Sequence, residues 1–397
     1  MAATHPGIRE ADAHSPDSAS APAQTRGGQI TLRLFEERDR DGLYAVYREA
    51  FGEEALARFD RRWQWQFVDN PAAKLAPLML WVGELEGRVV GCLSSHMTRM
   101  KIGNRELPHR FSNDLAVSTS ARGWGLGTRL IGAYYASVEH LATALYFTPT
   151  NRRIHDRHGY MPVRIYPMLV RPLNVGAMAR FELTSGRWPA WLSRAPMSWL
   201  VRSGAATVGS AVSVANRFIR PRRSRTYRVE QAAKAGDEFD ALWQSLRSHF
   251  PITTVRDRAF VQWRFFDDPA FTHTVLVARD GTGTPRGYLA ISLSENRGMR
   301  VGRVVDVFCS PEEPDVLDAI LREAIDRFDA AGVDVVSSLG MDPRLRTHLH
   351  RYLYLLPPGH QSPVLVAWRD REEDRAMVFD ENSYHLTGAD GDQWFAP

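Results

Sequence analysis

The sequence predicts an α/β fold with two tandem units, each containing a mixed sheet, joined by a helical connector. A strand-like run at residues 111–117 precedes a glycine-rich loop and apolar residues with helical spacing. Segments 65–71 and 263–269 share Trp, Phe, Asp and Pro at equal spacing. The same order of predicted elements surrounds both segments, which indicates a duplicated unit. A coincidence of two such segments is the alternative.

The composition is that of an ordinary globular protein, with 44% hydrophobic and 24% charged residues. A net charge of +4 over 397 residues is small, so we expect no nucleic-acid partner. The two cysteines, Cys92 and Cys309, lack metal-ligand spacing. We therefore expect buried thiols in a reducing, cytoplasmic compartment and no metal site. The absence of an apolar run of about 20 residues predicts no transmembrane segment.

Four segments are expected along the chain. Residues 1–28 are rich in Ala, Ser, Pro, His and Asp without an apolar centre, which is typical of a disordered tail. The first unit should span 29–171, the connector 172–225, and the second unit 226–397. The connector contains Trp-rich apolar segments and an Arg-rich end, so it can pack between the units or lie on an anionic membrane; we favour packing.

In the first unit we expect a helix at 41–51 before the Trp65 segment. A hairpin should follow, pairing 78–84 with 89–100 across Glu86-Gly87-Arg88. After it come a strand at 111–117, a helix with buried positions from Leu126 to Leu141, and a strand at 144–147.

The second unit should repeat this order. We expect a helix at 237–250 before the Trp263 segment. A hairpin follows, pairing 273–279 with 286–294 across a Gly-rich turn. A strand at 303–309 and a long amphipathic helix complete the repeat.

The loop between the strand at 111–117 and its helix has the features of a phosphate socket. Arg122 opens it, and glycines follow at 123, 125 and 127. Amides crowded at a helix N-terminus bind phosphate, and glycine allows close approach. The spacing differs from the GxGxxG dinucleotide fingerprint, and no Gly-Lys-Ser/Thr follows as in a P-loop.

This Arg-Gly-x-Gly-x-Gly loop resembles the acyl-CoA pyrophosphate loop of GNAT-superfamily acetyltransferases. A second feature fits the same superfamily, since Asn151 opens a predicted short helix that Gly159-Tyr160 closes. The resemblance covers residues 29–171 well and 226–370 loosely. It implies an acetyl-CoA-dependent N-acetyltransferase, with acetyl-CoA as cosubstrate and a small-molecule amine, such as an amino sugar, as acceptor.

The resemblance also implies which residues bind the cosubstrate. The pyrophosphate falls to the loop, and the preceding strand lines the pantetheine, with the Val117 amide polarising the thioester carbonyl. The expected cosubstrate-binding residues are Leu115, Val117, Arg122, Gly123, Trp124, Gly125, Leu126, Gly127, Thr128 and Asn151.

The second unit carries no such loop. Its strand at 303–309 is followed by Ser310-Pro311-Glu312-Glu313-Pro314, in which no glycine remains. Two carboxylates would repel a pyrophosphate, and Pro314 removes an amide donor. We therefore expect one cosubstrate site and a degenerate second copy.

Catalytic groups are less clearly marked. His155 occupies the position where the superfamily usually has a Tyr acid, so it is the candidate proton donor, with a hydrogen-bonding structural role as the alternative. His158 should pack. Asp114 should share a strand face with Ser112 and Ala116 and is the candidate base; a buried structural Asp is the alternative. His96 and His109 are weaker candidate bases, and Trp65 and Trp263 favour a structural role.

Two other classes of function stay open. A non-catalytic acyl-CoA sensor would keep the loop without turnover, and a tRNA-dependent aminoacyl transferase of tandem fold would need a larger basic cleft. The sequence leaves the oligomeric state open, and also whether the C-terminal end reaches the active pocket.

Overall fold

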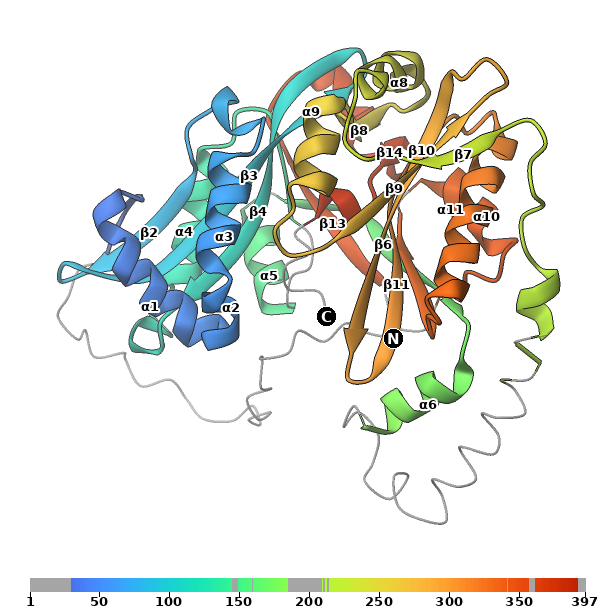
Figure 1. Cartoon of the computed structure of the whole chain (residues 1–397). Helices are drawn as coiled ribbons and strands as arrows, with labels where there is room; N and C mark the ends of the chain where they lie inside the picture. The colour runs from blue at the N-terminus through green and yellow to red at the C-terminus, as the bar shows by residue number, and fades with distance from the viewer. Residues whose placement is uncertain are drawn as a thin grey trace.

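The computed structural model describes residues 30–144, 149–158, 160–184, 209, 211–212, 214–340, 342–356 and 361–391 (Figure 1). The predicted tail at 1–28 and the connector tryptophans Trp188 and Trp199 lie outside these ranges.

The first unit contains the predicted elements in the predicted order. Its strands are β1 (Thr31–Leu34), β2 (Leu80–Leu85), β3 (Arg88–Ile102), β4 (Arg105–Val117), β5 (Leu141–Ala144) and β6 (Met161–Pro172). Its helices are α1 (Arg40–Phe51), α2 (Glu53–Ala57), α3 (Phe59–Trp63), α4 (Leu126–Ala136) and α5 (Pro149–Arg157). The helix expected to reach Leu141 ends at Ala136, where the Ser137 hydroxyl donates to the Ala133 carbonyl. Leu141 begins the next strand instead, and 145–147 lie outside the described residues.

After α6 (Val175–Thr184), the second half of the chain contains a similar but not identical series of elements. Its strands are β7 (Arg228–Gln231), β8 (Ile252–Thr254), β9 (His273–Arg279), β10 (Pro285–Asn296), β11 (Met299–Cys309), β12 (Val335–Leu339), β13 (Gln361–Trp368) and β14 (Tyr384–His385). Its helices are α8 (Glu238–Leu246), α9 (Arg258–Val261), α10 (Pro314–Ala330), α11 (Pro343–His350) and α12 (Arg375–Val378). The mixed α/β fold is therefore confirmed.

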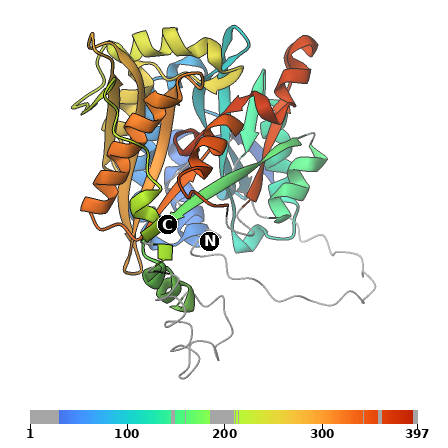
Figure 2. The ribbon, with the colours of Figure 1, turned by 90° about the vertical axis from the view of Figure 1, so that its right-hand side faces the viewer.

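The strand order reads almost the same from both ends. It runs β1-β2-β3-β4-β5-β13-β6-β12-β11-β10-β9-β7, with β4–β5 and β11–β12 parallel. The second unit's β13 lies between β5 and β6, while the first part of β6 pairs with β13 and its last five residues pair with β12 (Figures 1 and 2). Each unit thus contributes a late strand that pairs with strands of the other unit. Local sequence patterns did not predict this exchange. The unit boundaries at 171 and 226 remain a prediction. Strands from both sides of these boundaries pair with one another in one continuous sheet.

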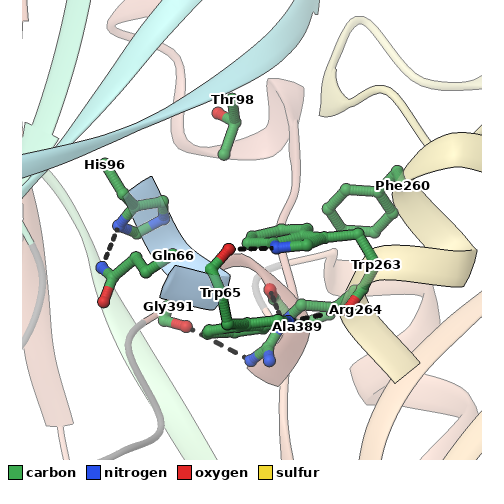
Figure 3. Close-up of a pocket in the computed structure, with 9 residues that line it drawn as sticks. All are labelled: Trp65, Gln66, His96, Thr98, Phe260, Trp263, Arg264, Ala389 and Gly391. Atoms are coloured by element: carbon green, nitrogen blue, oxygen red, sulfur yellow. Dashed lines mark hydrogen bonds between the residues drawn. The ribbon is translucent and has the colours of Figure 1, made fainter. Parts of the chain in front are cut away.

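The two tryptophans of the repeated segment meet where the units join. Trp65 and Trp263 each lie in a π-helical turn, at Gln64–Val68 and Gln262–Phe266. Their rings stack with centroids 4.6 Å apart and an interplanar angle of 16°. Each indole Nε1 donates to the main-chain carbonyl of the other, at 2.9 and 2.8 Å (Figure 3). The repeated motif therefore has the structural role that the sequence favoured.

Candidate functional site

The loop after β4 has the conformation that its glycines allow. Gly123 and Gly125 have φ values of +83° and +71°, in the region that favours glycine. Gly125 is the N-cap of α4, and its carbonyl accepts from the Arg129 amide. The first-turn amides of an α-helix have no acceptor within the helix, so those of residues 126–128 remain available to a ligand.

Two glycines that sequence reasoning missed let this helix approach the sheet closely. Leu126, the first residue of α4, is buried against β2 and β3. A Cβ on Gly83 or on Gly91 would lie 2.7 Å from a Leu126 methyl carbon. The sequence signal for this close approach was the pair of glycines that face each other in the two strands of the hairpin. Without side chains, they leave room for a side chain that packs onto the sheet.

The end of β4 lies against the loop, as expected. A Cβ on Gly127 would lie 3.9 Å from Leu115 Cδ2 and 4.0 Å from Val117 Cγ2. Arg122 and Trp124 are exposed at the loop surface. The Glu49 carboxylate of α1 accepts from the Thr119 amide at 2.6 Å and from the Ser118 hydroxyl at 2.8 Å, which fixes the approach to the loop.

The helix α5 places its two histidines differently. His155 is buried edge-on to Tyr160, with ring centroids 4.6 Å apart. Burial, together with nearby His158, lowers the pKa of His155 to about 4, so its imidazole is neutral at pH 7. His158 packs on α4, where a Cβ on Gly132 would lie only 2.8 Å from its ring. Asn151 lies in α5, but its side chain is outside the described residues.

Asp114 lies in a buried network rather than at a solvent-accessible position. Its Oδ2 accepts from the Tyr47 hydroxyl at 2.7 Å and from Ser94 Oγ at 3.2 Å, and it is 2.7 Å from Arg62 Nη2. The side chains of Arg62 and Asp114 are only 5% and 4% exposed. Three donors already occupy one oxygen of this buried carboxylate, so the geometry favours the structural alternative for Asp114.

The expected alternation along β4 is wrong at this point. Ser94 pairs with Asn113 and Cys92 with Ala116, so Leu93 faces both Asp114 and Leu115 in a β-bulge. Asn113 and Asp114 consequently reach the same face, since they bond His96 and Ser94, which are two residues apart on β3. Ser112 therefore lies on the opposite face from Asp114.

His96 is neutral, and its Nδ1 accepts hydrogen bonds from side-chain amides. Arg62 Nε donates to Gln66 Oε1 at 2.7 Å, so the amide nitrogen of Gln66 faces His96 Nδ1, 3.1 Å away. Nδ1 must then accept, and the ring proton lies on Nε2. Burial and the nearby guanidinium groups of Arg264 and Arg62 lower the pKa of His96 to about 3. These features argue against His96 as a base.

His109 is a structural residue of the sheet. Its ring nitrogens bond the hydroxyls of Thr98 and Thr143, at 2.8 and 3.1 Å, and thereby link β3, β4 and β5. Burial lowers its pKa well below the ordinary value.

A pocket lies between the two units, beside the tryptophan pair (Figure 3). His96 and Gln66 lie on one side of it, and Arg264 lies under the Trp65 ring. The buried Arg264 donates to the carbonyls of Ala389 at 2.8 Å and Gly391 at 3.4 Å. The chain therefore reaches this pocket as far as Gly391; residues 392–397 are outside the described residues.

The second unit presents a different surface at the position of the loop. Pro314 is the first residue of α10, and Glu313 is its N-cap. The Glu313 carboxylate pairs with Arg286 at 2.5 Å, while Glu312 is 78% exposed. The carboxylates at this helix terminus are unsuited to a phosphate ligand.

The described residues contain neither a metal-binding cluster nor a membrane-spanning helix. No cluster of three or more His, Cys, Asp or Glu residues there could hold a metal ion. None of the helices in those ranges is both long and apolar enough to cross a bilayer.

Comparisons with known proteins agree with this geometry. Residues 40–160 match the model of the Acetyltransferase (GNAT) family. No curated protein sequence matches significantly.

Solved structures resemble the chain over most of its length. A GCN5-related N-acetyltransferase from Anabaena variabilis is 14% identical with a TM-score of 0.54, over 85% of this chain and 72% of that one. N-myristoyltransferase from Saccharomyces cerevisiae with bound myristoyl-CoA is 12% identical with a TM-score of 0.54, over 92% and 91%. A GCN5-related N-acetyltransferase from Kribbella flavida is 14% identical with a TM-score of 0.53, over 86% and 71%. The chain therefore has a GNAT-like fold, and its match to the GNAT family model lies within residues 40–160.

Proposed function

We propose that the protein is an acyl-CoA-dependent N-acyltransferase that acts on the primary amine of a small molecule, with acetyl-CoA as the donor. The observation that carries the proposal is the loop at 122–128, where left-handed glycines precede the unpaired amides of a helix N-terminus. An anionic pyrophosphate fits such a site because the helix dipole and the Arg122 guanidinium both favour negative charge.

The reaction proposed is direct attack. The amine nitrogen forms a bond to the thioester carbonyl carbon, the carbon–sulfur bond breaks, and the CoA thiolate leaves and gains a proton. The main chain of Leu115 and Val117 would hold the pantetheine, with the Val117 amide donating to the carbonyl oxygen as negative charge develops.

The two proton transfers need only a small contribution from side chains of the protein. His155 would hydrogen-bond the departing thiolate as a neutral imidazole, because its lowered pKa makes it a poor source of an imidazolium proton at pH 7. Thiolate is a good leaving group, so a weak donor suffices. An ammonium can release its proton to water, which removes the need for Asp114 as a base.

The test is release of free CoA thiol from acetyl-CoA and longer acyl-CoAs with a panel of amines that includes amino sugars. Arg122→Gln should raise the KM for acyl-CoA by about tenfold to a hundredfold, because a charge-assisted phosphate contact contributes about 1.5–3 kcal/mol. Arg88→Gln is the matched control, since Arg88 is an exposed arginine at the start of β3, next to the β2–β3 turn. CoA binding without turnover of any amine would favour a sensor, and absence of both would reject the proposal.

A further inference from the structure

The backbone of Asp114 is in an unusual conformation for a residue inside a strand. Its φ is +44°, and only four non-glycine residues of the described chain have a positive φ. Glu86 and Arg297 lie in hairpin turns and Leu353 follows α11, so Asp114 is the one within a strand. Asp tolerates this region better than most residues, but it does so at a cost that the surroundings must offset.

The bulge at Asp114 determines which way the end of β4 faces. Before it, Phe111 and Asn113 contact His96 on one face of the sheet. Strict alternation would put Leu115 and Val117 on that same face. The extra residue reverses the phase, so their side chains lie beside Gly127 of the loop instead.

Three donors converge on one carboxylate oxygen and hold this conformation. Tyr47, Ser94 and Arg62 come from α1, β3 and α3, and all meet Asp114 Oδ2 within 3.2 Å. These three donors, which we call the Asp114 clamp, thus hold the bulge from α1, α3 and the neighbouring strand β3.

We infer that Asp114 is a positioning residue for acyl transfer: its clamped carboxylate holds the β4 bulge that turns the main chain of residues 115–117 toward the acyl-CoA loop. The inference rests on the proposed function and replaces the role of base. Displacement of that main chain would weaken the binding of pantetheine and misplace the thioester carbonyl. Acyl-CoA affinity and turnover would therefore both fall, although no proton-accepting group has been removed.

The second unit offers a matched control. Asp306 on β11 is fully buried and accepts from the Tyr288 hydroxyl at 2.6 Å and from Arg256. It has no positive φ, and the glutamate-rich segment 310–314 follows its strand. Asp306→Asn should therefore lower stability without altering acyl-CoA binding.

The experiment measures acyl-CoA Kd by calorimetry, and kcat and KM across pH, for the full-length wild type, Asp114→Asn, Tyr47→Phe and Asp306→Asn. Asp114→Asn should raise the Kd and KM for acyl-CoA about tenfold or more and lower kcat, with the shape of the pH profile retained. Tyr47→Phe should act in the same direction but less, and it remains informative if Asp114→Asn does not fold.

The outcomes separate the two proposals. Wild-type protein that binds no acyl-CoA would reject the proposed function. Wild-type binding and turnover, with unchanged Kd in Asp114→Asn and Tyr47→Phe, would reject only the positioning role. An unchanged Kd together with loss of the acidic limb of the pH profile would make Asp114 the base and overturn this inference.

Discussion

Replacement of Trp65 by Phe tests the contact that joins the two units. The change keeps an aromatic ring in the stack but removes the indole N–H that donates to the Trp263 carbonyl at 2.9 Å. A buried carbonyl left without a donor costs about 1–3 kcal/mol. The smaller ring loses part of a stacking energy of about 0.5–1.5 kcal/mol. We therefore expect the free energy of unfolding to fall by about 1–4 kcal/mol.

The assay is urea unfolding followed by far-UV circular dichroism, with Trp263→Phe as the symmetric partner. The symmetric bond, 2.8 Å from Trp263 Nε1 to the Trp65 carbonyl, predicts a similar loss for that variant. The double variant should deviate from additivity by about 0.5–1.5 kcal/mol because both changes affect one stack. Losses below about 0.5 kcal/mol, as at ordinary surface positions, would refute the reasoning.

The remaining predictions concern the loop, α5 and the tail. Gly125→Ala forces a Cβ into φ +71° and should cost about 1–2 kcal/mol in thermal unfolding while weakening CoA binding in calorimetry; unchanged binding would contradict the loop assignment. Gly132→Ala places a Cβ 2.8 Å from the His158 ring and should destabilise by about 1–3 kcal/mol, with partial recovery in the double variant with His158→Ala; no recovery would reject that packing. The pKa of His155 is lowered from 6.5 to about 4, so the unfolded chain binds more protons between these values and stability should fall as pH drops through that window; His155→Gln should reduce the loss measured between pH 7 and pH 5, and an equal loss would count against burial of a neutral His155. Arg256→Met leaves Asp306 and Asp390 buried without their partner and should cost about 3–5 kcal/mol in urea unfolding, whereas a neutral effect would show that the pair contributes little.

Local sequence patterns predicted what depends on local chemistry. Glycines at 123 and 125 marked the left-handed loop, and the hairpin turn at Glu86-Gly87 was predicted within two residues of its strands. Helical spacing located α1 and α4, because one apolar face of each packs on the sheet.

Features that depend on distant contacts were missed. The exchange of β13 and β6 between units joins segments about 200 residues apart, for which no local signal exists. The bulge at Asp114 is stabilised by Tyr47 and Arg62, and their spacing from it along the chain carries no pattern. Strict alternation then gave Asp114 a face shared with Ser112, which the bulge makes wrong.

The central claim is that main-chain amides at 123–128 bind the pyrophosphate of CoA. Hydrogen–deuterium exchange with and without CoA tests it at those amides, because a bound phosphate slows the exchange of the N–H groups that donate to it. We predict protection confined to the loop and the first turn of α4, and none at 310–316 in the second unit. CoA binding that leaves exchange at 123–128 unchanged would contradict the account.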